Sequence, residues 1–130
     1  MEDEKGGVTE NPVNHQITFS GLFDKNHLKN LRWKPMRTGI EYFLIHGDLG
    51  KGPAAALLRY APGALLPLHR HGGYEHIFIL TEYQQDDTGT YEAGTLVVNK
   101  PGSQHRVTTP RGGIALVIWD KPVEFLHTEK

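Results

Sequence analysis

The chain has 130 residues, with 14 lysines and arginines against 15 aspartates and glutamates, and a formal net charge of −1. This length predicts one domain with a sizeable core, and the balanced charge excludes a strong field for nucleic acid or an anionic membrane surface. The chain contains no cysteine, which excludes disulfides, thiolate metal sites and a cysteine nucleophile, and no apolar run reaches the roughly 20 residues of a membrane span.

The N-terminal segment is acidic, contains glycine and has almost no large apolar side chains. We therefore expect residues 1–14 to be a flexible tail of one domain that comprises residues 1–130. The first residues lack the apolar stretch of a signal peptide, so we expect a cytoplasmic protein. Residues 17–23 are expected as a strand, and residues 24–31 as one helical turn capped by Asp24 or as a loop.

The rest of the chain consists of short apolar runs separated by turns that contain glycine or proline. The runs that we expect to be strands are residues 40–45, 54–60, 65–71, 74–81, 95–99, 104–108, 114–119 and 123–126. In the run at 54–60, residues that point to either face of a strand are apolar, which indicates a strand covered on both faces. Many short strands at this spacing predict an all-β barrel or sandwich.

His69 and His71 are two residues apart on one of these strands, so both side chains point to the same face. Imidazole is a common ligand of zinc, iron and nickel, with bonds of about 2.0–2.1 Å for zinc. A further ligand must come from elsewhere in the chain, and Gly72-Gly73 marks the place where the chain can turn back.

The length of that turn decides which residue joins the two histidines. A two-residue hairpin would place His76 beside His69, whereas a three-residue loop through Tyr74 would pair His71 with Glu75 and turn Glu75 inward. In the strand that follows, both sets of alternating residues are apolar, so the alternation of apolar and polar residues does not decide between Glu75 and His76.

His105 follows a turn at Pro101-Gly102-Ser103, and antiparallel strands can bring it back to the first two histidines. The candidate metal ligands are therefore His69, His71 and His105, with Glu75 or its rival His76 as the fourth. In contrast, Glu82, Asp86 and Asp87 are expected to be solvated carboxylates of turns.

These spacings resemble the two motifs of the cupin superfamily. The first motif consists of a glycine, two histidines, a glutamate and a closing glycine, and its first four positions correspond to Gly63, His69, His71 and Glu75. Glu82 stands where the closing glycine is usual. The second motif ends in a glycine and a histidine after an earlier glycine, and these correspond to Gly94, Gly102 and His105.

Residues 58–63, 69–71 and 91–103 further resemble ChrR-type cupins, a group with the cupin half of a zinc-binding anti-sigma factor and with acetylacetone-dioxygenase-like enzymes. The resemblance implies a double-stranded β-helix, or jelly-roll-type barrel, that is commonly a homodimer. It also implies a divalent metal ion (Fe, Zn, Ni or Mn) held by His69, His71, Glu75 and His105, which favours Glu75 over His76. Acetylacetone-dioxygenase-like members bind iron through three histidines only.

Two functions from different classes follow from this resemblance. The first is a metal-dependent enzyme, a dioxygenase that acts on a small organic molecule at open coordination positions. The alternative is a non-catalytic cupin, either a zinc-binding sensor in which four protein ligands saturate the ion or a module that binds a small ligand. Both imply a small-molecule or metal partner and neither implies nucleic acid or a membrane.

Overall fold

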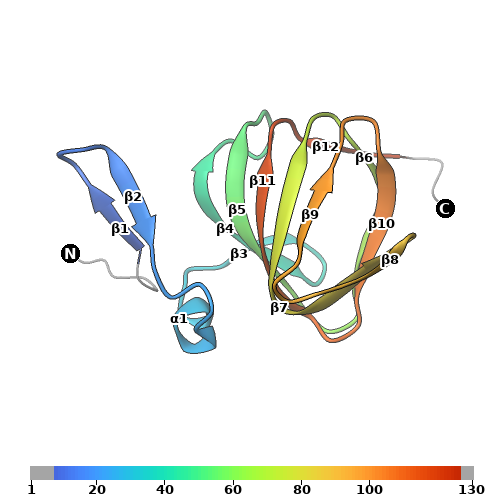
Figure 1. The fold of residues 1–130 in the computed structure, drawn as a ribbon, viewed down its shortest axis with the longest axis horizontal. Helices are drawn as coiled ribbons and strands as arrows, with labels where there is room; N and C mark the ends of the chain where they lie inside the picture. The colour runs from blue at the N-terminus through green and yellow to red at the C-terminus, as the bar shows by residue number, and fades with distance from the viewer. Residues whose placement is uncertain (1–7, 127–130) are drawn as a thin grey trace. The chain divides into compact units, whose positions relative to one another are not determined.

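The computed structural model describes residues 8–126, and these residues form two compact units, one ending at Trp33 and the other beginning at Lys34 (Figure 1). The prediction of a single domain over residues 1–130 stays a prediction. Within the described residues, the structure contains no helix of the length and apolarity that crossing a membrane requires.

The first unit contains a β-hairpin and a short helix. Its elements are β1 (Val8–Asn11), β2 (Gln16–Phe19) and α1 (Lys25–Lys29), and the two strands pair antiparallel. The Asp24 side chain accepts a hydrogen bond from the Asn26 amide at 2.9 Å, so the capped helical turn is confirmed. The expected tail therefore includes a strand from residue 8 onwards, while residues 1–7 lie outside the described residues.

The second unit is built from strands alone, which confirms the all-β prediction. Its elements are β3 (Lys34–Arg37), β4 (Ile40–Gly47), β5 (Ala54–Tyr60), β6 (Ala64–His71), β7 (Glu75–Asp86), β8 (Gly89–Glu92), β9 (Leu96–Asn99), β10 (Gln104–Thr109), β11 (Gly113–Trp119) and β12 (Val123–Phe125). All of their pairings are antiparallel, and they form one curled sheet in the order β12-β6-β10-β7-β11-β5-β4-β3 (Figure 1).

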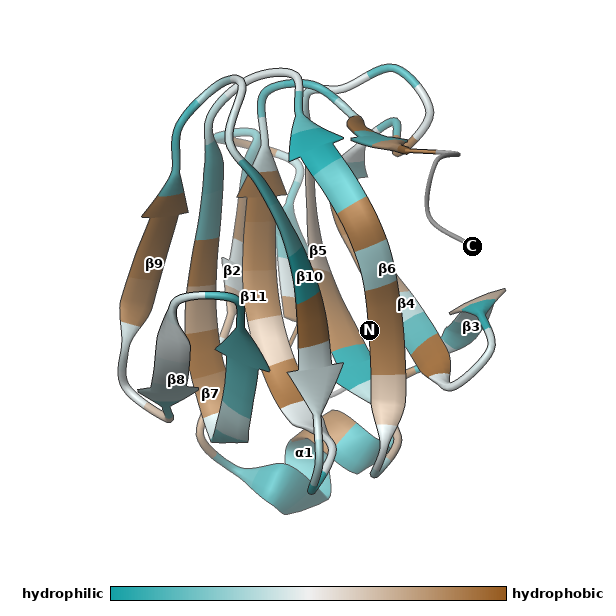
Figure 2. Ribbon diagram, turned by 90° about the vertical axis from the view of Figure 1, so that its right-hand side faces the viewer, coloured by the Kyte–Doolittle hydropathy of each residue, from teal (hydrophilic) through white to brown (hydrophobic). Residues whose placement is uncertain are grey.

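The longest strand, β7, joins the parts of this sheet. It pairs with β11 and β9 along its first half and with β8 near its end, where it also meets β10. This lets the sheet curl around an apolar interior, and apolar residues recur along β6, β7 and β11 (Figure 2). Strand β5 is buried at six of its seven residues, as expected for a strand covered on both faces.

The connection from β6 to β7 differs from the expected hairpin. Strand β6 pairs with β10 and β12 and not with β7, so residues 72–74 cross from one part of the sheet to another. The crossing is tight, because a Cβ on Gly73 would lie 2.8 Å from the Cβ of Asp120. Glycine is needed there for close approach of the backbone and not for a two-residue turn.

Glu82 occupies a left-handed backbone conformation within β7, with φ of 60°. This is the position at which the cupin motif has its closing glycine. A residue with a Cβ pays roughly 1–2 kcal/mol for this conformation, whereas glycine adopts it freely. The Glu82 carboxylate accepts a hydrogen bond from Arg111 at 3.1 Å, on the protein surface. The backbone at residue 82 therefore keeps a conformation that suits the glycine of the motif, although the residue in this chain is glutamate.

We expect Glu82→Gly to be more stable than Glu82→Ala by about 0.5–1 kcal/mol, because glycine relieves the backbone strain at some cost in unfolded-state entropy. Both variants lose the contact with Arg111, so the difference between them isolates the backbone term. Urea denaturation of the two variants measures this difference. Equal stabilities would show that the left-handed conformation is not kept in solution.

Candidate metal centre

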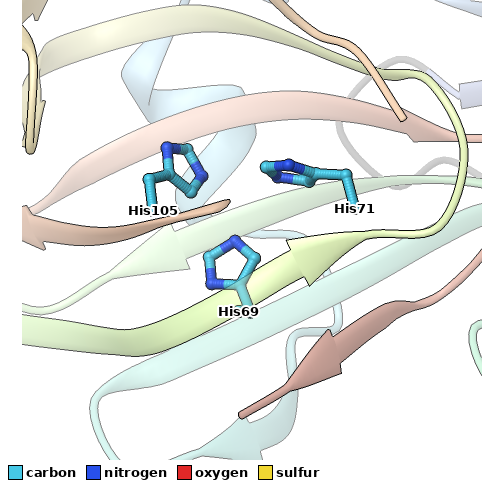
Figure 3. A group of neighbouring side chains, drawn as sticks. All are labelled: His69, His71 and His105. Carbon is cyan, nitrogen blue, oxygen red and sulfur yellow. The ribbon is translucent and has the colours of Figure 1, made fainter. Parts of the chain in front are cut away.

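Three histidines from two neighbouring strands meet inside the curled sheet. His69 and His71 both point inward from β6, and His105 is the direct cross-strand partner of His69 on β10. The side chains are buried, with 1%, 2% and 6% of their surface exposed. One nitrogen from each ring lies within 4.8 Å of the others, and the rings surround a common space (Figure 3). The structure thus brings together the three predicted histidines.

Each of these rings has its Nδ1 atom next to a hydrogen-bond acceptor. The His69 Nδ1 lies 2.8 Å from the Pro67 carbonyl oxygen, and the His71 Nδ1 lies 3.0 Å from the Ser103 carbonyl oxygen. The His105 Nδ1 lies 3.0 Å from a carboxylate oxygen of Asp86. In the neutral rings these acceptors hold the proton on Nδ1, which leaves the Nε2 lone pairs free to bind a metal ion.

Two of these Nε2 atoms are buried and have no hydrogen-bond partner among the described residues, those of His71 and His105. Buried polar atoms are nearly always satisfied, and an unpaired one costs about 1–3 kcal/mol. A divalent metal ion would satisfy both atoms at once. The chemistry of the donors therefore fits a metal ion, and the nitrogens, which all lie within 4.8 Å of one another, are near enough for one ion to gather them.

Glu75 lies beside this cluster but is not one of its three mutually close donors. Its Oε1 lies 2.9 Å from the His71 Nε2 and accepts a hydrogen bond from the Asn99 amide at 3.0 Å. With the His71 proton on Nδ1, two lone pairs face each other across that 2.9 Å gap, which only a proton or a cation can bridge. Glu75 is therefore placed to complete a metal site, and its role as a ligand stays a prediction.

His76, the rival of Glu75, is on the opposite face of β7. Neighbouring residues of a strand point to opposite sides, and Glu75 lines the interior cavity whereas His76 borders an outer groove. Its cross-strand neighbours are Val98 and Ile118, both of which are exposed. His76 therefore cannot reach the three histidines without a shift in register.

The pKa of His69 is lowered from 6.5 to about 4, chiefly by burial and also by the neighbouring His105, while the Pro67 carbonyl acts in the opposite direction. Burial alone would raise the pKa of Glu75, but the adjacent His71 imidazole and the hydrogen bond from Asn99 outweigh it and lower the pKa. Both shifts favour the forms that bind metal, a neutral imidazole and a carboxylate.

These shifts predict how the metal-free protein responds to acid. A histidine of the unfolded chain titrates near 6.5 and His69 near 4, so the unfolded state binds more protons between these values. The free energy of unfolding should therefore fall as the pH drops from 6.5 to 4. Urea denaturation at several pH values measures the slope, which should be shallower in His69→Gln. Equal slopes in the two proteins would contradict the assignment.

Asp86 was expected to be a solvated turn carboxylate, and that expectation is wrong. Only 9% of its side chain is exposed, and its Oδ2 accepts the hydrogen bond from the His105 Nδ1. Its Oδ1 accepts hydrogen bonds from the backbone amides of Thr88 and Gly89 and from the Tyr91 hydroxyl. Burial would raise its pKa, but these hydrogen bonds outweigh it and lower the pKa. Asp86 therefore orients a predicted metal ligand.

A cavity of about 400 Å³ borders the metal centre. His69, Glu75 and His105 contribute to its lining, which is otherwise largely apolar and includes Ile77 and Val117. A volume of this size is typical of sites for small organic molecules. The protein thus combines a buried set of metal-ligand side chains with a space for a small molecule beside them.

A curled antiparallel sheet with inward histidines on neighbouring strands defines a cupin. The chain belongs to the family of ChrR cupin-like domains, whose model matches residues 25–124. This confirms the resemblance that the motif spacings indicate.

The fold is also similar to that of solved cupin structures. An acetylacetone dioxygenase from Acinetobacter johnsonii has a TM-score of 0.69 at 17% identity, with 94% of this chain and 85% of that chain covered. The complex of Rhodobacter sphaeroides SigE with the anti-sigma ChrR has a TM-score of 0.63 at 24% identity, with 72% of this chain and 50% of that chain covered. At these identities the likeness shows the fold alone.

Among curated proteins, the chain is similar to the putative dimethylsulfoniopropionate lyase DddL of Cereibacter sphaeroides. The two are 33% identical over 52 residues, which is 38% of this chain and 22% of that protein. The chain therefore spans about a fifth of this relative and half of the matched chain in the SigE–ChrR complex.

Proposed function

We propose that the protein is a metal-dependent enzyme that acts on a small organic molecule, with dioxygenase as its specific class. The observation that carries this proposal is the position of the histidine cluster on the wall of the 400 Å³ cavity. A purely structural metal site needs no such space beside it, whereas an enzyme needs room for its substrate next to the metal.

The residues of the chain divide the work between binding the ion and shaping the cavity. His69, His71 and His105 would hold a divalent ion, and Glu75 would complete the site or accept a proton beside it. A bound ion would supply Lewis acidity, and a redox-active one would also allow chemistry with dioxygen. The apolar walls, including Leu58, Ile77 and Val117, would exclude water from the bound substrate.

The donor set supports iron, nickel, zinc or manganese. Imidazole and carboxylate are ligands that all four ions accept, and the chain has no thiolate to select a softer ion. The dioxygenase class is further supported by the fold shared with the Acinetobacter johnsonii enzyme. This support rests on fold similarity, so the class of reaction is the part of the proposal that needs an experiment first.

Elemental analysis of protein purified without added metal, followed by oxygen-electrode measurements, tests the proposal. Pentane-2,4-dione, which is acetylacetone, is the probe because the Acinetobacter johnsonii protein of similar fold is an acetylacetone dioxygenase. We expect the iron-loaded protein to consume oxygen in its presence and the metal-free protein not to. A tightly held, four-coordinate zinc ion with no exchangeable position, and no oxygen uptake after iron loading, would favour a non-catalytic zinc sensor instead.

A homodimer and a cytoplasmic location are further parts of the proposal. The homodimer is supported by exposed apolar residues on the outer face of the sheet, namely Leu96, Val98 and Ile118. The mass of the protein in solution, measured by light scattering, tests the homodimer.

A further inference from the structure

The cavity has a second polar region apart from the metal centre. Among the described residues, only two hydroxyl or amide side chains of its lining are more than nine-tenths buried, Tyr60 with 6% and Gln84 with 5% exposed. Tyr60 ends β5, and Gln84 lies near the end of β7. Both are inward-facing residues of strands that form the wall of the cavity.

Neither side chain has a hydrogen-bond partner within the part of the chain that the structure describes. Their polar atoms are also not among the fully enclosed unpaired atoms of these residues, which are the Nε2 atoms of His71 and His105, so they stay accessible from the cavity. Outside the histidine cluster, two other buried polar residues are paired: Thr109 donates to the Ala61 and Ala64 carbonyls, and Glu75 accepts from Asn99. Polar groups in a largely apolar wall that no protein group pairs with are uncommon unless water or a ligand pairs with them. Tyr60 and Gln84 are therefore unpaired polar groups that face the space for a small molecule.

The two side chains are close to each other. Both line the main cavity, and both also line a second, small void between β5, β7 and β11. The register explains this, because Gly113 of β11 pairs with Tyr60 on one side and with Glu82, two residues before Gln84, on the other. Gly113 has no side chain between them, so a ligand in the cavity can meet both polar groups.

We propose that Tyr60 and Gln84 together bind an oxygen atom of the substrate at a distance from the metal centre. This inference rests on the proposed function and specifies its substrate class. The substrate carries two oxygen functions joined by a short apolar segment. One function meets the histidine cluster, and the other accepts hydrogen bonds from the Tyr60 hydroxyl and the Gln84 amide nitrogen.

The second oxygen function is uncharged, for example that of a ketone, an ester or an amide. Tyr60 and Gln84 are neutral groups in a largely apolar wall, and a buried charge without a partner of opposite sign is costly. Glu75 and Asp48 place negative charges on the same cavity, and Glu75 affects Tyr60 electrostatically. The cation of the lining, Arg37, stacks over the Phe125 ring. A carboxylate beside Tyr60 would therefore be repelled, whereas a carbonyl oxygen would not.

Affinities of paired probes for the zinc-loaded protein test this inference, because zinc is redox-inert and permits measurement without turnover. The probes are hexane-2,5-dione and heptane-2,6-dione, whose two carbonyls are too far apart to form the six-membered metal chelate of a 1,3-diketone, each compared with the monoketone of the same length. We expect at least one diketone to bind about tenfold or more tightly than its monoketone, as one buried hydrogen bond to a carbonyl provides. Tyr60→Phe and Gln84→Leu should each remove most of this preference.

The matched control is Gln85→Leu, because the Gln85 amide donates to Thr90 and does not line the cavity. This variant should keep the preference of the wild type. Thermal stability provides a second readout: Tyr60→Phe and Gln84→Leu should be as stable as the wild type or more stable, since each removes an unpaired polar group. A role in folding alone would instead lower the stability of both.

The inference is overturned if no diketone is preferred in the wild-type protein, or if the preference survives in both cavity variants. In metal-free protein, where no ion competes for the carboxylate, a tighter binding of the keto acid 4-oxopentanoate than of hexane-2,5-dione that is lost in both cavity variants would overturn the uncharged class. The same titrations with metal-free protein separate the two proposals. If the protein binds no metal, the proposed function fails, whereas a preference for diketones that depends on Tyr60 and Gln84 would still support this inference.

Discussion

His71→Ala should lower the affinity for zinc or iron by more than about 100-fold. Loss of a residue that merely orients a ligand costs about 10–100-fold in metal affinity, and loss of a ligand itself should cost more. The His71 Nε2 is buried without a hydrogen-bond partner among the described residues, so its removal takes away a donor that nothing replaces. Competition with a chromogenic chelator measures the affinity.

His76→Ala is the matched control for this prediction. Its side chain borders the outer groove, so the variant should keep the metal affinity of the wild type to within a few-fold. Glu75→Ala should fall between the two, because Glu75 contacts the His71 Nε2 without being one of the three mutually close donors. If His76→Ala empties the site while Glu75→Ala does not, the assignment of faces on β7 is wrong.

Asp86→Asn should lower metal affinity about 10–100-fold, although Asp86 does not touch the ion site. The Asp86 Oδ1 accepts hydrogen bonds from the amides of Thr88 and Gly89, so the oxygen of an asparagine would stay on that side. Its NH₂ group would then face the His105 Nδ1 and donate to it. This places the proton of the neutral ring on Nε2, where it blocks metal binding.

The tautomer of His105 distinguishes this effect from a loss of stability. Nitrogen chemical shifts of the metal-free protein should show the His105 proton on Nδ1 in the wild type and on Nε2 in Asp86→Asn. Asp87→Asn is the control, because it makes the same chemical change at an exposed neighbour. An unchanged tautomer together with unchanged metal affinity in Asp86→Asn would contradict a positioning role for Asp86.

Much of this fold is predictable from the positions of glycine and proline between short apolar runs. The two-residue spacing of His69 and His71 was enough to place both on one face of a strand, because side chains alternate along strands whatever the topology. His105 is far from His69 in the sequence, but antiparallel pairing of their strands makes the two residues direct cross-strand partners. These features depend on local geometry, which a sequence encodes directly.

The features that the sequence did not predict depend on which strands pair. The chain leaves β6 through Gly72 and Gly73, a pattern typical of a hairpin, yet β6 pairs with β10 and β12. Asp86 has the sequence context of a turn, and its carboxylate does accept the hydrogen bonds of a turn. Its second oxygen reaches His105 only because β10 lies beside the end of β7, and no local pattern encodes that contact.

The central claim is that the Nε2 atoms of His69, His71 and His105 bind one metal ion. X-ray absorption spectroscopy of protein loaded with one equivalent of zinc tests it most directly. The account predicts three imidazole nitrogens at about 2.0–2.1 Å from the ion. A spectrum with one imidazole or none, in protein that holds the ion stoichiometrically, would contradict it.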